Sequence, residues 1–374
     1  MGRYLLLDGH SLAYRAFYAL PADMATSSGQ VTNAVYGFTA MLAKVVSDLE
    51  PDGLAVAFDT STPTFRKELD ATYKAGRKET PDLFKQQLPL IREVLDALAV
   101  PVVEAPGFEA DDVIATLATR AAADGHEVVV VTGDRDSYQL VADPHIRVLY
   151  NKRGVSDYAL YDEAGILERT GVTPAQYPEY AALRGDASDN LPGVPGIGEK
   201  TAAKLVTTYG DLDGIFANLD QLPPKQRANL AEWETQVRHN HEMSVLRRDV
   251  SLGVGVGDLR FAAFEIEPAR DCKTLPPAEG ESAVGGVFVK LDCEKLDAPE
   301  KRRLALTVRY LRKPGQADRD PRASVLARVS ALDLEQRYAP LRDKDSGHVC
   351  TGNTMYRAQH LREIGGFDET LGYG

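Results

Sequence analysis

The sequence predicts an α/β domain built on a parallel sheet, then an all-helical domain, and then a poorly defined tail. Three short, continuously apolar runs are typical of buried parallel strands; they are Tyr4–Leu7, Leu54–Phe58 and Val128–Thr132. Amphipathic helical patterns lie between or beside them, at Ala34–Leu49, Leu83–Leu98 and Asp112–Ala123. Strands that alternate with helices indicate right-handed crossovers over one sheet. From about Pro174 to about Arg248 the pattern is wholly helical, which predicts the second domain.

These patterns divide the chain into four parts. We expect an α/β catalytic domain over residues 1–172, with a helical arch at about 64–98, and a helix–hairpin–helix domain over 173–255. Glycines at 253, 255 and 257 end the helical pattern, and the Pro-, Gly- and Glu-rich stretch Glu267–Gly286 predicts a linker over 256–286. Residues 287–374 form the tail.

Composition favours an ordinary globular protein. Of the 374 residues, 44% are hydrophobic and 26% charged, and no apolar run approaches the ~20 residues that span a bilayer. We therefore expect a monomeric cytoplasmic protein that does not contact a membrane. The three cysteines, Cys272, Cys293 and Cys350, match no zinc motif, so we interpret them as unpaired thiols.

The net charge of −12 is unevenly distributed. Residues 283–374 hold 16 Lys and Arg against 13 Asp and Glu, which gives +3, whereas the other 282 residues hold 27 against 42, which gives −15. A site of clustered carboxylates is acidic by construction, and bound divalent cations reverse its local charge. The acidity therefore does not exclude nucleic acid, but it requires local basic contacts.

Each predicted strand is followed by acidic residues, and two further acidic groups lie at a helix start and in a loop. The strand-end acids are Asp8, Asp59, Asp134 and Asp136, and the others are Glu109, Asp111, Asp112, Asp186 and Asp189. A single Asp in such a place is usually a turn or cap residue, but five groups at the carboxyl edge of one sheet predict a shared site. Oxygen ligands without His or Cys favour two or more Mg²⁺ or Mn²⁺ ions, the usual device for phosphodiester hydrolysis.

Two segments are suited to holding nucleic acid. The stretch Arg184–Lys204 has glycines just before a helix start, where free backbone N–H groups hold phosphate, although one Gly-Ile-Gly alone could be a simple turn. Its candidate DNA contacts are Gly193, Gly196, Gly198, Lys200, Thr201 and Lys204. The second segment, Thr64–Lys78, interleaves basic and aromatic residues in a way that suits single strands, or else forms a solvated helix face. Its candidate residues are Arg66, Lys67, Tyr73, Lys74, Arg77 and Lys78.

Taken together, these blocks resemble the 5′-nuclease (5′-3′ exonuclease) domain of bacterial DNA polymerase I, within the flap endonuclease superfamily. The matching blocks are Leu7–Phe17, Ala57–Asp59, Thr64–Arg66, Tyr73–Arg77, Glu109–Val113, Thr132–Asp136 and Arg184–Lys204. The resemblance implies a PIN-like domain in which Asp8, Asp59, Glu109, Asp111, Asp134 and Asp136 form the inner metal cluster, supported by Asp112, Asp186 and Asp189.

The resemblance also implies roles for the basic residues and the hairpin. Lys74, Arg77 and Arg66 would steer the scissile phosphate, and the hairpin Gly193–Thr201 would bind duplex DNA and hold a K⁺ ion. The implied reaction is hydrolysis of DNA near a single-strand/duplex junction, from a 5′ end or flap, as in DNA replication and repair. A DNA-binding module with a silent site and a related nuclease acting on RNA are the alternatives.

The tail resembles a different family. His348–Arg357 and Ile364–Glu369 are similar to an acceptor-side segment of family 2 glycosyltransferases. The nucleotide-sugar-binding strands of that family are not recognisable upstream, so we expect a fragment, from a fusion or a gene-prediction error, rather than a working glycosyltransferase.

Overall fold

The computed structural model describes residues 2–25, 30–154 and 157–260, together with the backbone of strands β7 (Val287–Lys295), β8 (Arg302–Tyr310), β9 (His348–Thr351) and β10 (Thr354–Arg357). The chain forms two compact units, each made of several segments. Unit 1 contains Met1–Leu12, Gly53–Thr80 and Pro101–Arg260, and unit 2 contains Ala13–Asp52, Pro81–Val100 and the remainder. The glycosyltransferase-like tail residues lie outside the part whose side chains are described.

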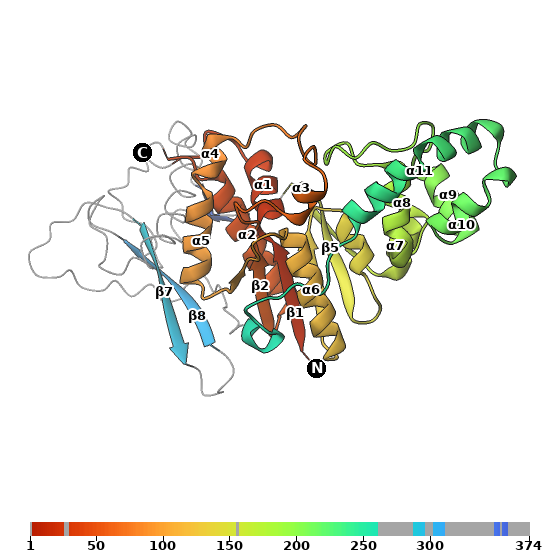
Figure 1. Ribbon diagram of the computed structural model, residues 1–374. Helices are drawn as coiled ribbons and strands as arrows, with labels where there is room; N and C mark the ends of the chain where they lie inside the picture. Colours follow the sequence, from red (N-terminus) through yellow and green to blue (C-terminus); the bar gives the residue numbers. More distant parts are fainter. Residues whose placement is uncertain are drawn as a thin grey trace, which may run out of the picture. The chain divides into compact units, whose positions relative to one another are not determined.

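A six-stranded sheet forms the centre of unit 1 (Figure 1). Its spatial order is β3-β2-β1-β4-β5-β6, and the strands are β1 (Arg3–Asp8), β2 (Gly53–Ala57), β3 (Val102–Val103), β4 (Glu127–Thr132), β5 (Ile146–Arg153) and β6 (Asp157–Tyr161). The three predicted strands are confirmed as β1, β2 and β4. They occupy the middle of the sheet, where both faces are covered, which explains their continuous hydrophobicity.

The sheet is mixed rather than wholly parallel, which corrects the prediction for its edge. β5 pairs with β4 in parallel, whereas β6 pairs with β5 in antiparallel fashion. Only residues 154–156 separate β5 from β6, and a connection that short can form a hairpin but not a parallel crossover. Unlike the central strands, which are continuously buried, β5 and β6 are only partly buried, and neither gave a strand signal in the sequence.

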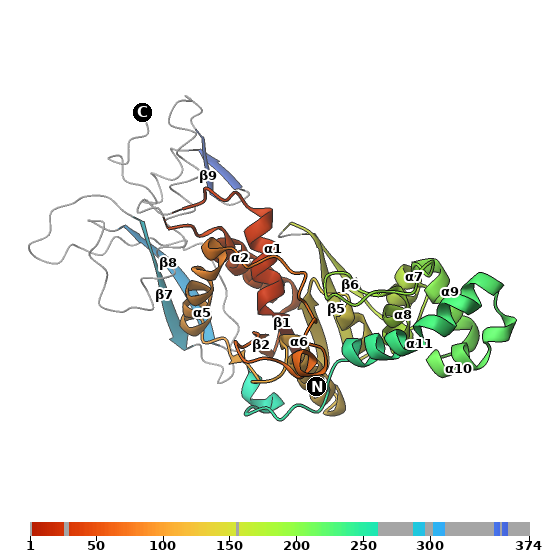
Figure 2. The ribbon, with the colours of Figure 1, turned by 45° about the horizontal axis from the view of Figure 1, so that its top comes forward.

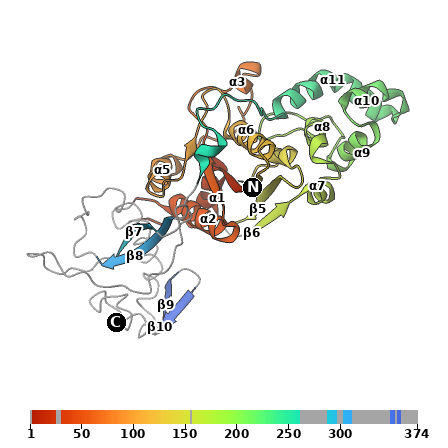
Figure 3. The ribbon, with the colours of Figure 1, turned by 90° about the horizontal axis from the view of Figure 1, so that it is seen from below.

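The helices of unit 1 lie both among the strands of the sheet and after its last strand. The long helix α6 (Ala110–Ala123) lies against β1, β2 and β4, and α3 (Phe65–Leu69) is a short helix at the start of the basic segment. The helices after the sheet are gathered beside β5 and β6 (Figures 2 and 3). They are α7 (Glu163–Thr170), α8 (Tyr177–Arg184), α9 (Glu199–Tyr209), α10 (Leu212–Ala217) and α11 (Pro224–Ser244).

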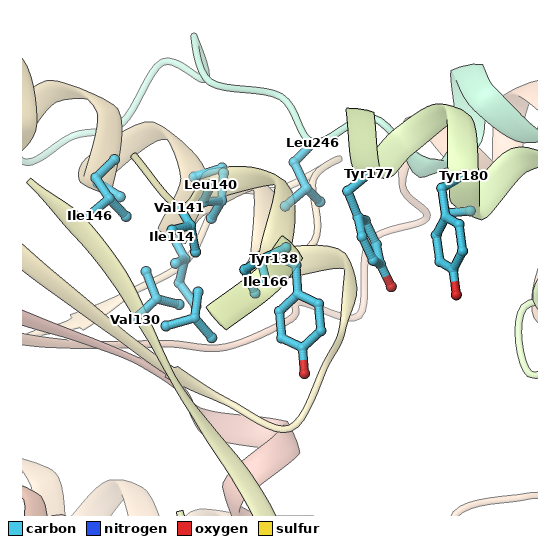
Figure 4. Close-up of a cluster of buried hydrophobic side chains, with 14 of the residues drawn as sticks. Ile114, Val130, Tyr138, Leu140, Val141, Ile146, Ile166, Tyr177, Tyr180 and Leu246 are labelled. Atoms are coloured by element: carbon cyan, nitrogen blue, oxygen red, sulfur yellow. The ribbon is translucent and has the colours of Figure 1, made fainter. Parts of the chain in front are cut away.

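A buried cluster joins the sheet to these helices. After β4 the chain turns into the 3₁₀ helix Asp136–Leu140, whose Tyr138 ring contacts the Tyr177 ring of α8 with a centroid distance of 5.5 Å. Figure 4 shows these rings beside Ile166 and Leu246 in one apolar group. The packing of Tyr138 in this apolar group therefore holds the turn that follows β4, and this turn carries Asp134 and Asp136.

The packed part of unit 1 continues past residue 256, where we expected the linker to begin. Residues Val256–Leu259 form a 3₁₀ helix, Leu259 is buried, and Arg260 forms an antiparallel bridge with Gly53, the first residue of β2. Val256 and Leu259 belong to the apolar core of unit 1, beside α6 and β2. The glycines at 253–257 therefore mark the end of the helices and not the end of the fold.

Unit 2 contains α2 (Asn33–Leu49), α4 (Asp82–Lys85), α5 (Leu88–Ala97) and most of α1 (Gly9–Ala19). The predicted single helix Leu83–Leu98 is split into α4 and α5. Pro89 lies in the first turn of α5 and has no N–H to continue the preceding helix. At the break, buried Gln87 accepts hydrogen bonds from the first N–H groups of α2 through its Oε1, at 2.8 Å from Ala34 N.

Candidate active site

The register of the central strands brings the strand-end acids together in unit 1. Asp8 ends β1 opposite Ala57 of β2, and Leu7 lies opposite Val131 of β4. Asp59 follows β2 and Asp134 follows β4 at the same edge of the sheet. The predicted convergence of three strand ends is therefore present in the structure.

Asp8 is buried and is held by two hydrogen bonds. Its Oδ1 accepts from the backbone N of Ser11 at 2.9 Å, as an N-cap of α1, and its Oδ2 accepts from Thr132 Oγ1 at 3.0 Å. Burial raises the pKa of Asp8 to about 7, and the charges of Asp59 and Asp134 add to this increase. Sequence reasoning missed Ser11 and Thr132, although an Asp three residues before a Ser at a helix start is a capping signal.

Asp59 connects the end of β2 to the start of α6, where Glu109 and Asp111 lie. Its Oδ1 accepts a hydrogen bond from Ala110 N at 2.7 Å, at the start of α6, and its backbone N donates to His10 Nδ1 at 3.2 Å. The Asp59 side chain is 46% exposed. This carboxylate is thus anchored through one oxygen while the group remains open to solvent.

Asp111, Asp134 and Asp136 are ionisable groups in a shared low-dielectric environment. Burial raises the pKa of each of them, and the negative charges of neighbouring acids, Asp8 and Asp134 among them, raise the pKa of Asp111 and Asp136 further. Asp111 Oδ1 is buried and has no hydrogen-bond partner. An uncompensated carboxylate of this kind is costly unless a cation neutralises it.

Glu109 and Asp189 form ion pairs with two basic residues of the predicted arch. Lys74 Nζ contacts Glu109 Oε1 at 2.6 Å, and Arg77 pairs with Asp189 Oδ1 at 2.5 Å. Tyr73 is buried, and its hydroxyl lies 3.2 Å from Glu109 Oε2 and 3.0 Å from Asp189 Oδ2. The predicted base-stacking role of Tyr73 does not fit this position, because its ring is covered by the protein.

The backbone of residues 72–77 is also hydrogen-bonded to the loop between α8 and α9, which carries Asp189. Lys74 N donates to Asp189 O at 2.9 Å, and Asn190 Nδ2 donates to Thr72 O at 3.0 Å. Lys74 and Asn190 both have a left-handed backbone, with φ of 59° and 61°, which costs energy in a residue other than glycine. The joint between the basic segment and the acidic loop is therefore specifically constrained.

Arg66 and Asp112 lie beneath the cluster rather than on its open side. Their side chains are 2% and 0% exposed, and Arg66 NH1 lies 2.6 Å from Asp112 Oδ2. Burial alone would lower the pKa of Arg66, but hydrogen bonds and charge from Asp112 outweigh it and hold that pKa above its ordinary value. Neither side chain is placed as the sequence suggested: Arg66 does not reach solvent, and Asp112 is shielded from it.

The remaining acids lie in the loop between α8 and α9, which closes on itself. Asp186 and Leu191 exchange backbone hydrogen bonds, and Asp186 Oδ1 accepts from Ser188 N at 2.7 Å. A Cβ on Gly193 would lie 1.9 Å from Arg184 O, so the two ends of the loop can meet only without a side chain there. This closure directs Asp186 and Asp189 toward the turn after β4, whose Asp134 and Asp136 are repelled by both charges.

The predicted hairpin is present just before α9. Gly196 has φ of 79°, and Gly198 is the N-cap of α9. Thr201 lies in the first turn, and Lys200 and Lys204 are exposed. Arg135, between the two acids after β4, pairs with Glu199 at 3.2 Å and links the hairpin helix to the cluster. Lys67 and Lys78 are also exposed, as a phosphate contact requires.

The donor set fits hard divalent cations but is not a closed cage. Within the described residues, no group of three His, Cys, Asp or Glu side chains converges as a ready-made ligand set. Mg²⁺ needs no such cage, because it keeps several waters and is bound through one or two carboxylates. The buried, unpartnered oxygen of Asp111 and the raised pKa values around it are consistent with that mode of binding.

The fold and site together define a nuclease with an acidic centre at the carboxyl edge of its sheet and a helical domain beside it. A family model for the 5′-3′ exonuclease N-terminal resolvase-like domain matches residues 3–171, and one for the 5′-3′ exonuclease C-terminal SAM fold matches residues 172–267. The chain therefore belongs to the 5′-3′ exonuclease family over this range, as the resemblance in its sequence implied.

Relatives of known identity agree with this placement. DNA polymerase I of Mycobacterium bovis is 51% identical over 266 residues, which cover 70% of this chain, and DNA polymerase I of Bacillus caldotenax is 42% identical over 266 residues, or 71% of this chain. The match spans 29% and 30% of the length of these relatives. The chain thus corresponds to less than a third of each polymerase.

Solved structures confirm the fold. The T5 D15 protein co-crystallised with metal ions aligns with a TM-score of 0.54 at 21% identity, covering 65% of this chain and 89% of that one. The bacteriophage T5 D15 flap endonuclease in a complex with DNA and metal ions gives 0.55 at 20% identity, covering 65% and 88%. The family models end at residue 267 and give the glycosyltransferase resemblance no support. In the described part of the chain, no helix is both long enough and apolar enough to span a membrane.

Proposed function

We propose that residues 1–267 form a divalent-metal-dependent 5′ nuclease that hydrolyses DNA beside a single-strand/duplex junction, removing 5′ nucleotides or flaps. The observation that carries this proposal is the convergence of four acids at one sheet edge: Asp8 is buried, and Asp111, Asp134 and Asp136 are partly buried. Asp111 Oδ1 is itself buried without a partner, and the pKa values of all four acids are raised. Protein chains seldom bury so many like charges without a cation to neutralise them. The T5 neighbour solved with DNA and metal ions supports the same assignment.

The carboxylates would hold Mg²⁺ or Mn²⁺ in two regions. Bound there, the ions would lower the pKa of an attacking water and stabilise the leaving oxygen. The first region comprises Asp8, Asp59, Glu109, Asp111, Asp134 and Asp136, and the second is shaped by Asp186 and Asp189. Thr132 and Ser11 would keep Asp8 oriented through the hydrogen bonds described above. Asp112 has no free oxygen for this purpose.

The basic residues would act on the substrate phosphate. Lys74 and Arg77 are already at the carboxylate cluster through their pairs with Glu109 and Asp189. Neutralising these two acids with metal ions would leave both cations free to pair with a phosphate in the same place. The exposed Lys200 and Lys204 and the α9 N-terminus would bind the duplex backbone without reading its bases. The K⁺ ion at the hairpin, which the family resemblance implies, stays a prediction.

The test is cleavage of a 5′-flap duplex by the full chain in Mg²⁺, compared with Asp134→Ala. We expect flap cleavage by the wild type that is lost in the variant and in EDTA. Equal rates in both proteins would refute the proposal. Flap binding in Ca²⁺ without turnover in Mg²⁺ would instead indicate a silent DNA-binding module, and faster cutting of the matched RNA flap would indicate a ribonuclease.

A further inference from the structure

We infer that Arg66 and Asp112 are a positioning pair for the active site: together they fix Glu109 and the segment that carries Lys74, and neither contacts metal or phosphate. This inference rests on the proposed nuclease function, because it assigns the two residues a role in that reaction. It separates Asp112 from the other acids and Arg66 from the other arch bases.

Asp112 has no capacity left for a metal ion. A carboxylate has about four lone-pair sites, and the protein fills all of them here. Oδ1 accepts from Arg66 NH2 and from Arg247 N, each at 2.9 Å. Oδ2 accepts from Arg66 NH1 at 2.6 Å and from Glu109 N at 3.1 Å. A metal at either oxygen would have to displace one of these bonds in a fully buried site.

Arg66 is equally saturated. Its Nε donates to Met243 O at 2.8 Å and its NH2 to Val245 O at 3.2 Å, in addition to the bidentate pair with Asp112. The guanidinium also lies 4.5 Å from the centre of the Phe65 ring. With 1% of the residue exposed, a phosphate could reach Arg66 only if the surrounding backbone opened.

The pair joins three elements that are distant in the sequence. Arg66 belongs to α3, Asp112 to the first turn of α6, and Met243 to the end of α11. The backbone N of Glu109 donates to Asp112 Oδ2, and Arg66 NH1 lies 3.5 Å from Glu109 Oε2. Glu109 in turn contacts Lys74 at 2.6 Å. The position of the Lys74–Glu109 contact therefore depends on a buried pair that is anchored to the helical domain.

The experiment compares three variants of the full chain with the wild type: Asp112→Asn, Glu109→Gln, and the double variant Arg66→Met with Asp112→Leu. The double variant replaces the buried pair by apolar side chains of similar size, a change that often preserves stability, whereas removing one partner leaves an unpaired buried charge. Mn²⁺ binding is measured by titration calorimetry without DNA, folding by thermal melting, and flap cleavage by steady-state kinetics.

We expect both Asp112 variants to lose no more Mn²⁺ affinity than Glu109→Gln loses, because misplacing the Glu109 carboxylate costs at most what removing its charge costs. We expect kcat to fall about 10–100-fold in the double variant with little change in KM, which is the usual effect of losing an outer partner of a metal site. If Asp112→Asn does not fold, the Mn²⁺ affinity and the kcat of the double variant decide whether the inference holds.

Two results would overturn the inference. A loss of Mn²⁺ affinity in the folded Asp112 variants that is clearly larger than that in Glu109→Gln would make Asp112 a ligand, because displacing Glu109 alone cannot account for it. A double variant that melts like the wild type and also keeps its kcat would show that the pair does not position the site. If the wild type cleaves no flap, the proposed function fails instead, and the Mn²⁺ comparison still tells whether Asp112 is a ligand.

Discussion

Replacing Asp8 by Asn should stabilise the metal-free protein at pH 8 while abolishing cleavage. Asp8 has a pKa raised from an ordinary value of 3.8 to about 7 by burial and by neighbouring carboxylates. Between these two pH values the folded state binds more protons than the unfolded state, so stability falls as pH rises through this window. Above pH 7 the full cost of the buried charge is present, and the Asn variant does not carry it.

The expected gain follows from that change in pKa. It corresponds to about 4 kcal/mol at pH 8. An Asn side chain can still accept from Ser11 N and can donate to Thr132 Oγ1, but it loses the charge-assisted character of both bonds, which costs about 1 kcal/mol. The net gain is about 3 kcal/mol, or a melting temperature higher by roughly 6–12 °C for a folded part of this size.

Thermal melting of wild type and Asp8→Asn in EDTA, at pH 5 and pH 8, measures this gain. The matched control is Asp59→Asn, the same change at the neighbouring strand end, where the carboxyl is 46% exposed and the melting temperature should change little. Adding Mg²⁺ at pH 8 should raise the melting temperature of the wild type more than that of Asp8→Asn. A difference between wild type and Asp8→Asn that is as large at pH 5 as at pH 8 would refute the reasoning, as would no difference at either pH.

Three further predictions concern the basic residues and the loop. Lys74→Ala should slow flap cleavage about 100-fold while duplex binding in Ca²⁺ changes little, because Lys74 lies at the cluster; equal losses of rate and binding would contradict this. Lys200→Ala should weaken binding to all sequences and reduce the slope of log affinity against log salt by about one, and an unchanged slope would exclude a phosphate contact. Gly193→Ala should lower the free energy of unfolding by about 2–4 kcal/mol in thermal melts, since its Cβ would lie 1.9 Å from Arg184 O. Gly198→Ala is the control, because the added atom meets open space there. Equal melting temperatures of the two variants would show that the close approach at Gly193 is absent.

The central sheet and its acidic edge were predictable because both follow from local sequence. β1, β2 and β4 are buried on both faces, so their apolar runs are continuous. Parallel strands place their carboxyl ends at one edge, so an acid after each strand had to approach the others. The hairpin before α9 was predictable for a similar reason, since its glycines stand directly before a helical pattern and close to Asp186 and Asp189 in the sequence.

The edge of the sheet and the break between α4 and α5 were less accessible to sequence reasoning. β6 is half exposed, so it has no continuous apolar run, and its direction depends on a short connection. The break between α4 and α5 had one local signal, Pro89, which the apolar pattern of residues 83–98 outweighed. The contact that Gln87 makes at the break, with the start of α2 more than fifty positions earlier, left no signal in the sequence.

The sequence by itself determined the fold class, the family and the set of acidic residues, because these depend on hydrophobic runs, turn residues and spacing. It could not separate the acids and bases that face the cluster from those that support it. Arg66 and Lys74 look alike in the basic segment, yet Arg66 is buried against carbonyls of Met243 and Val245, and Lys74 meets Glu109. Only the tertiary structure decided this, because burial and hydrogen-bond saturation arise from residues more than a hundred positions apart.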